Sequence, residues 1–131
     1  MALVVPDVAE IILLQYLLNM VAATHPVLHL YTNNLTPAEA TVLGGLTEST
    51  EAGYAAITLP GTSWTTTQSV GVTTGVYSEQ TFTYTTGVTV YGYYITNTSN
   101  QLLWLERFAG GPFILPTGGG EIAVQPKITL E

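Results

Sequence analysis

The most distinctive hydrophobic pattern lies at residues 90–108, which read VYGYYITNTSNQLLWLERF. Two apolar segments flank a short polar stretch, and this arrangement predicts a β-hairpin with its turn at 97–100. In a hairpin at the surface of a soluble domain, apolar and polar residues normally alternate, because one face packs on the core and the other faces water. Here apolar residues occupy both faces of both strands. The pattern therefore predicts a hairpin that is covered on both sides.

The turn position sets the pairing of the two strands. With a turn at 97–100, Ile95 would lie opposite Leu102 and Tyr93 opposite Trp104, and we expect this face to belong to the core. The second face would carry the remaining large apolar side chains, Tyr94, Leu103 and Leu105. We expect the N-terminal helix or a partner subunit to cover it.

The N-terminal segment predicts one substantial helix, at residues 7–23. Asp7 can cap its N-terminus, with Glu10 three residues later as the return partner. The polar positions Glu10, Gln15 and Asn19 form only a narrow stripe, which is typical of a helix that is buried on most sides. One small sheet would hardly enclose such a helix, so contact with another chain is a second way to cover it.

From Val27 onward the pattern predicts β-structure, with a long loop at 33–50. Short segments rich in β-branched and aromatic residues alternate with turn signals such as Pro60-Gly61. The expected strands are 27–32, 53–59, 62–68, 69–77, 80–86, 88–96, 102–109, 121–125 and 127–130.

About eight short strands at this spacing predict a mainly β protein, a jelly-roll-like antiparallel β-sandwich with one N-terminal α-helix. The 131 residues are expected to form a single domain. It would comprise an N-terminal arm at 1–6, the helix at 7–23 and the β-sandwich at 27–131.

Composition excludes several function classes. Only 8% of the residues are charged, against roughly 25% in an average globular protein. Arg107 and Lys127 are the only basic residues beside nine acidic ones, which gives a net charge of −7. This balance repels phosphate groups and anionic lipids, so we expect neither nucleic-acid nor membrane binding.

The apolar N-terminus does not read as a targeting or membrane-spanning segment. It has no basic region at its start, and Pro6, Glu10 and Gln15 interrupt it before about 20 apolar residues accumulate. We therefore expect a protein made in the cytoplasm. The chain contains no cysteine, which excludes disulfides and thiolate metal sites.

Candidate catalytic and metal-binding residues are few. His25 and His29 are four residues apart, but a strand would separate them by about 13 Å, too far to chelate one ion. Glu48 and Glu51 form the nearest carboxylate pair, and in a Ser/Thr-rich loop a solvated surface is their ordinary interpretation. We expect no metal, no cofactor and no catalytic site.

Three further features favour structural interpretations. Glu106 and Arg107 point to opposite faces of a strand, so each is expected to form an ion pair across strands or with a neighbouring subunit. The run at 118–120 lacks the lysine of a phosphate-binding loop and precedes a strand, which predicts a hairpin turn. Trp64 and the tyrosines could stack on sugars, but aromatic residues at strand positions lie more often in the core.

The order of segments resembles a group of small virion structural proteins of tailed bacteriophages, of the capsid cement or head decoration type. The resemblance covers almost the whole chain, through LVVPDVAEIILLQYLLN, LHLYTNN with TPAEA, GYAAITL, VYGYYIT, LLWLERF and PKITL. It implies a compact β-sandwich that binds the major capsid protein on the outside of an assembled head, as a homo-oligomer (trimer or dimer). It implies no catalytic or cofactor-binding residue.

We therefore expect a non-enzymatic structural protein that is made in the host bacterial cytoplasm and is located on the capsid exterior of the virion. The alternative is a tail, neck or fibre-tip β-sandwich module of a phage virion, which could bind glycans. The residues expected at an interface are Val4, Val5, Leu13, Leu17, Tyr94, Leu103, Leu105 and Arg107.

Overall fold

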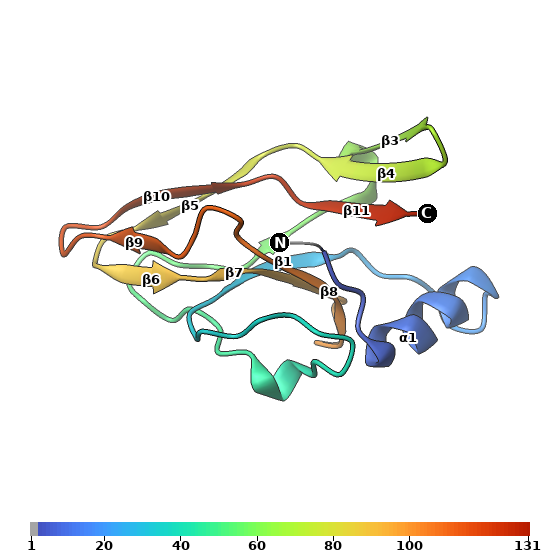
Figure 1. Ribbon diagram of the computed structural model, residues 1–131, viewed down its shortest axis with the longest axis horizontal. Helices are drawn as coiled ribbons and strands as arrows, with labels where there is room; N and C mark the ends of the chain where they lie inside the picture. Colours follow the sequence, from blue (N-terminus) through green and yellow to red (C-terminus); the bar gives the residue numbers. More distant parts are fainter. Residues whose placement is uncertain (1–2) are drawn as a thin grey trace.

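The computed structural model describes residues 3–131, which form a mainly antiparallel β protein with one N-terminal helix (Figure 1). The helix α1 spans Asp7–Leu17, and two short 3-10 turns lie at Leu43–Gly45 and Gly61–Ser63. The described chain has eleven strands: β1 (Val27–Tyr31), β2 (Ile57–Thr58), β3 (Trp64–Ser69), β4 (Val72–Tyr77), β5 (Gln80–Tyr84), β6 (Val88–Val90), β7 (Gly92–Thr96), β8 (Leu102–Arg107), β9 (Phe113–Leu115), β10 (Gly120–Val124) and β11 (Lys127–Leu130).

The strands form four small sheets that share one core. The sheet orders are β2-β1-β7-β8, β11-β4-β3, β10-β5 and β6-β9, and every pairing is antiparallel. In Figure 1, β3, β4, β5, β10 and β11 lie on one side of the molecule, and β1 and β6 to β9 lie on the other. The main buried cluster takes side chains from both sides, among them Leu30 of β1, Tyr93 of β7, Phe82 of β5 and Ile122 of β10.

The strand count exceeds the sequence prediction of about eight for local reasons. The predicted strand 88–96 is divided at Tyr91 into β6 and β7, which pair in different sheets. The strand β9 was not predicted, because its three residues lie between Pro112 and Pro116. The predicted strand 53–59 shrinks to the two residues of β2.

The helix α1 is shorter than the predicted range of 7–23. Asn19 adopts a left-handed conformation with φ of 55°, and the backbone N–H of Met20 donates to the carbonyl of Gln15 at 2.9 Å. This arrangement closes a helix C-terminus and satisfies carbonyls that would otherwise lack a donor. The predicted capping role of Asp7 is also wrong, because Pro6 occupies the cap position and no side chain caps the helix.

The predicted hairpin forms, but its register differs from the prediction. Ile95 lies opposite Trp104 rather than Leu102, and Tyr93 lies opposite Glu106 rather than Trp104. A β-bulge at the end of β7 places one additional residue of β8 in the ladder, which sequence spacing alone does not reveal. As a result, Leu102 and Leu103 exchange the faces that we predicted for them.

The second face of the hairpin is covered by the chain itself. Tyr31, Tyr94, Leu102 and Leu105 form a second buried cluster on that face. Hydrophobic residues from outside the sheet pack against this cluster: Val4, Leu35, Leu43 and Leu46. The expectation that the N-terminal helix or a partner subunit covers this face is therefore wrong. The segment at 33–50 covers it, and we call this segment the covering loop.

The helix packs elsewhere, along β8. Leu103 belongs to the main core, and Ile12, Leu13 and Tyr16 of α1 pack against that core. Ala9 is the fully buried residue of α1. The helix thus buries one side, and its opposite side remains on the surface.

Candidate functional site

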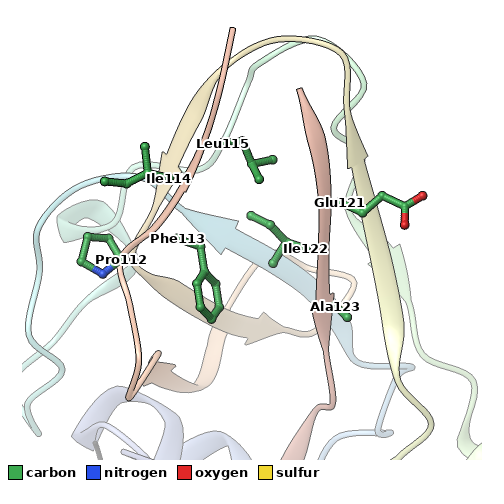
Figure 2. A pocket seen from close by; sticks show the side chains of 7 residues that line it. All are labelled: Pro112, Phe113, Ile114, Leu115, Glu121, Ile122 and Ala123. Carbon is green, nitrogen blue, oxygen red and sulfur yellow. The ribbon is translucent and has the colours of Figure 1, made fainter. Parts of the chain in front are cut away.

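An open cleft of about 410 Å³ lies between β9 and β10 (Figure 2). Phe113, Ile114 and Leu115 line it from β9, while Glu121 and Ile122 lie on the β10 side. The side chains that line this cleft include one carboxylate and no imidazole, hydroxyl group or cation. The cleft therefore holds no set of groups for acid–base or nucleophilic catalysis.

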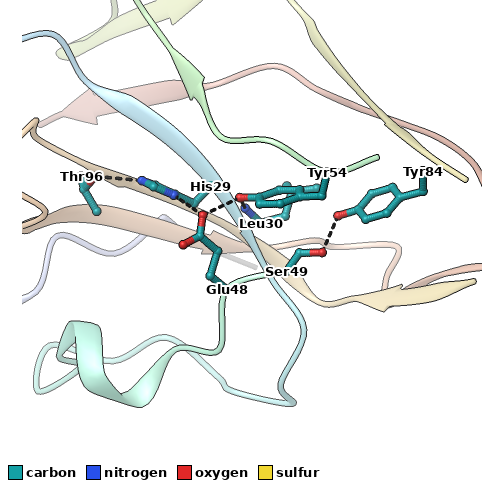
Figure 3. A network of polar contacts seen from close by, with 7 residues as sticks. All are labelled: His29, Leu30, Glu48, Ser49, Tyr54, Tyr84 and Thr96. Carbon is teal, nitrogen blue, oxygen red and sulfur yellow. Dashed lines mark hydrogen bonds and ion pairs between the residues drawn. The ribbon is translucent and has the colours of Figure 1, made fainter. Parts of the chain in front are cut away.

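A polar network lies where β1, β7 and the covering loop meet (Figure 3). The Nδ1 atom of His29 is 2.7 Å from Oε1 of Glu48, and its Nε2 atom is 2.9 Å from Oγ1 of Thr96. The Tyr54 hydroxyl donates to the same Glu48 oxygen at 2.9 Å and accepts the backbone N–H of Leu30 at 3.2 Å. The network therefore connects segments that are distant in the sequence.

The order of hydroxyl, imidazole and carboxylate in this network is that of a catalytic relay. A relay also needs a nucleophile that substrate can reach, and Thr96 is only 1% exposed. The ring of His29 is stacked on Tyr94 with 4.7 Å between the ring centroids, and neither the β9–β10 cleft nor the groove described below is lined by these residues. Because Glu48 precedes β2 at the end of the covering loop, the network's clearest effect is to fasten that loop to the sheet.

Glu48, near the end of the covering loop, and Glu51, just after it, are therefore more than a solvated surface. Glu48 is partly exposed, but it bonds to His29 and Tyr54. Glu51 accepts a hydrogen bond from the Ser49 hydroxyl, which lowers the pKa of the Glu51 carboxyl. Ser49 also bonds to the Tyr84 hydroxyl at 2.8 Å, so both carboxylates help to hold this segment in place.

Arg107 also fastens the covering loop. Its Nη1 atom donates to the carbonyl of Leu35 at 3.0 Å, and its guanidinium lies 5.1 Å from the centre of the Tyr91 ring. Within residues 3–131, Arg107 forms no ion pair with a carboxylate, so its expected pairing across strands is wrong. An ion pair of Arg107 with a neighbouring subunit stays a prediction.

Glu106 is half-buried, and this burial raises the pKa of its carboxyl, although Lys127 partly offsets the effect. Ionised Glu106 therefore destabilises the folded state at neutral pH, and this penalty disappears once the pH falls below the pKa of the unfolded chain. We expect Glu106→Gln to raise the melting temperature at pH 7. The gain should vanish near pH 4, where wild-type Glu106 is largely protonated in both states. Thermal melting across this pH range checks the prediction, with Glu79→Gln as the exposed control. A gain that persists at low pH would contradict it.

An exposed apolar region of the surface lies over α1. Its members are large hydrophobic side chains of α1, of the turn after it and of the end of β11, each 42–80% exposed. We call this set the α1 surface: Val8, Ile11, Leu14, Leu17, Leu18, Met20, Val21 and Leu130.

A groove of about 530 Å³ runs between α1 and β11 and adjoins this surface. Leu14 and Leu17 line it on the helix side, and Ile128 and Leu130 line it on the strand side. Glu10 is the one charged residue of its lining. A groove with this lining suits an apolar side chain of another protein better than a polar substrate.

Apart from Arg107, which holds the covering loop, the predicted interface residues divide into two groups. Val5, Leu13 and Leu17 line the α1–β11 groove. Tyr94, Leu103 and Leu105 are buried inside the chain, and the backbone of Val4 pairs with that of Leu105. The structure adds members that the prediction missed, Ile11, Leu14, Leu18 and Leu130, although the almost continuous apolar sequence of the helix signalled the first three.

No family model, curated protein or solved structure matches this chain.

Two further observations concern the types of site that the described residues offer. In residues 3–131, no group of three or more His, Cys, Asp or Glu side chains is positioned to hold a metal ion. No helix of the described chain has the length and hydropathy needed to cross a membrane.

Proposed function

We propose that this protein is a non-enzymatic structural component of a tailed-phage virion, which binds the outer surface of the capsid and stabilises the head. The observation that carries the proposal is the α1 surface. Apolar patches of this kind mark protein–protein contacts, whereas scattered single hydrophobic residues do not. The polar groups that catalysis would require are engaged inside the fold, around His29, which favours binding over chemistry.

The charge balance agrees with a role inside an assembly. Standard interfaces bury roughly 800 Å² per partner, and their centres are poor in charged residues. With 8% charged residues, this chain leaves much of its surface to apolar and uncharged polar groups, whose burial costs less desolvation free energy than the burial of charged groups. The sequence resemblance to head decoration proteins is what directs the proposal to the capsid, with the major capsid protein as partner. A jelly-roll-like β-sandwich is part of the same proposal.

The test is binding to expanded, DNA-filled heads of the same phage that lack this protein. We expect the purified protein to co-sediment with these heads, to saturate at a fixed ratio, and to raise the temperature at which they release DNA. Heads of an unrelated phage are the control and should bind little. Failure to bind the cognate heads would overturn the proposed function.

The alternative of a tail, neck or fibre-tip module receives less support. Its glycan-binding form depended on exposed aromatic residues, but Tyr93 and Tyr94 are buried. Trp64 is half-buried and packs edge-on against Tyr77 and Trp104. A reconstruction of the virion would separate the two proposals, because it would locate the protein on the shell or on the tail.

A further inference from the structure

The turn between β3 and β4 carries a valine in an unfavourable backbone conformation. Ser69 pairs with Val72, so Val70 and Gly71 are the two central residues of a two-residue hairpin turn. Their φ angles are 49° and 82°, and positive φ at both positions is the type I′ pattern, which favours Asn-Gly or Gly-Gly. In the left-handed region the Cβ atom lies too close to the backbone, and a β-branched residue there is a conformational outlier. Val70 therefore makes the folded chain less stable than asparagine or glycine would.

The chain has asparagine at its other positions of this kind. Among residues 3–131, the non-glycine residues with positive φ are Asn19, Val70 and Asn100. Asparagine tolerates the left-handed conformation because its short polar side chain can form local hydrogen bonds. Val70 is thus the exception, and its unfavourable conformation requires an explanation.

Burial within the chain does not explain the valine. Val70 is 100% exposed, the highest value among the exposed large hydrophobic residues of the described chain. Residues 65–71 are all exposed, so both faces of the outer part of β3 lie in solvent instead of alternating between core and water. Figure 1 shows this turn at the edge of the molecule. Val70 therefore contributes nothing to the core of its own chain.

The turn is continuous with the α1 surface through β11. Leu130, which belongs to the α1 surface, pairs with Thr73 of β4, three residues from Val70. Figure 1 shows the turn, the end of β11 and α1 at the same end of the molecule. A partner bound to the α1 surface is therefore well placed to contact the turn as well.

The residues around Val70 suit a pocket in a protein. The segment 62–78 includes no charged residue, so the turn can enter a pocket without desolvating a charge. The hydroxyl groups of Thr67 and Ser69 can exchange hydrogen bonds with the rim of such a pocket. A bilayer fits less well, because even a myristoyl chain gives only marginal membrane binding and one valine buries far less area.

We propose that the β3–β4 turn is a second contact site, in which Val70 inserts into an uncharged, apolar pocket on the surface of the head. Removal of the isopropyl group from water then offsets the unfavourable conformation of the turn, which is left uncompensated in the free protein. The inference rests on the proposed function for the identity of the partner. It adds a specific anchoring residue outside the α1 surface.

The test combines thermal melting of the free protein with its binding to expanded, DNA-filled heads of the same phage that lack this protein. Val70→Asn should raise the melting temperature by ~3–6 °C, because asparagine relieves the left-handed strain. The same variant should bind the heads ~10-fold or more weakly, because it replaces the inserted apolar group with an amide. A residue without a role in binding would not move these two measurements in opposite directions.

Two further variants separate the conformation of the turn from its apolar character. Val70→Thr keeps the β-branched shape, so it should melt near the wild-type temperature but bind the heads more weakly. Ile114→Asn removes an aliphatic side chain that is 72% exposed in the β9–β10 cleft, away from the turn. This control should bind the heads as the wild-type protein does.

The inference fails if Val70→Asn binds the heads as tightly as the wild-type protein, if it gains no stability, or if Ile114→Asn weakens binding equally. Binding of the wild-type protein, but not of Val70→Asn, to vesicles of phosphatidylglycerol and phosphatidylethanolamine would overturn the assignment to a protein pocket. A wild-type protein that does not bind the heads would overturn the proposed function and this inference with it. Wild-type binding that the Val70 substitutions leave unchanged would overturn the inference alone.

Discussion

Replacing Leu103 with lysine is expected to unfold the protein. Leu103 lies in the bulged part of β8, is 3% exposed and belongs to the main core. A lysine there must either bury its ammonium group without a partner or lose its charge, and each course costs several kcal/mol. Domains of this size have total stabilities of about 5–15 kcal/mol, so the substitution removes most or all of the available stability.

Circular dichroism and thermal melting check this expectation. The control is Val70→Lys, because Val70 is fully exposed in the turn between β3 and β4. The same change of side chain should leave the melting temperature there within a few degrees of the wild-type value. If Leu103→Lys melted cooperatively at the wild-type temperature, Leu103 would have to be accessible to water in the folded protein.

For the hairpin at 90–108, the sequence predicted burial of both faces correctly but predicted the wrong pairing of its two strands. A run of apolar residues on both faces of 90–108 requires that both faces be covered, and β7 is buried throughout. The bulge that exchanges Leu102 and Leu103 could not be predicted, because it depends on how β8 fits beside β7 rather than on local periodicity. Strands with clear ends were predicted closely. The bounds of β11, Lys127–Leu130, are those of the predicted strand.

The covering loop was the main feature that sequence reasoning missed. Leu35, Leu43 and Leu46 lie in a segment that Pro37, Gly44 and Gly45 interrupt, so no regular element is expected there and nothing local indicates that they share one target. The contacts that fasten the loop are also remote in sequence. His29 bonds to Glu48 across 19 residues and to Thr96 across 67. Such pairs become visible only once the strands are placed beside each other.

The candidate site was predicted in part for a simple physical reason. A helix with too few polar residues must either be covered or expose apolar side chains to the solvent. The predicted interface residues Leu13 and Leu17 line the groove between α1 and β11. The expectation that the helix or a partner subunit would cover Tyr94 and Leu105 was wrong. The covering loop already buries them, so the helix is left as the exposed apolar element.

Gly92→Ala is expected to cost about 3 kcal/mol or more of unfolding free energy. Gly92 begins the central strand β7, with Tyr31 of β1 on one side and Arg107 of β8 on the other. A Cβ atom at this position would overlap the carbonyl oxygen of Glu106 and lie 2.6 Å from the Tyr31 hydroxyl oxygen. Relief requires movement of the β8 backbone, which is more costly than the ~1–3 kcal/mol typical of an overpacked side chain.

Urea denaturation measures this loss, and Gly110→Ala provides the matched control. Beyond Gly110 and its two chain neighbours, no heavy atom lies within 4 Å of the position that a Cβ on Gly110 would take, and its φ is not in the left-handed region. The control should be neutral or slightly stabilising, because alanine restricts the unfolded chain more than glycine does. Since both variants add the same methyl group, the difference between their midpoints isolates the lack of room beside Gly92. Equal midpoints would mean that β7 and β8 separate enough to admit a side chain there, and that the second face of the hairpin is less tightly closed than its burial indicates.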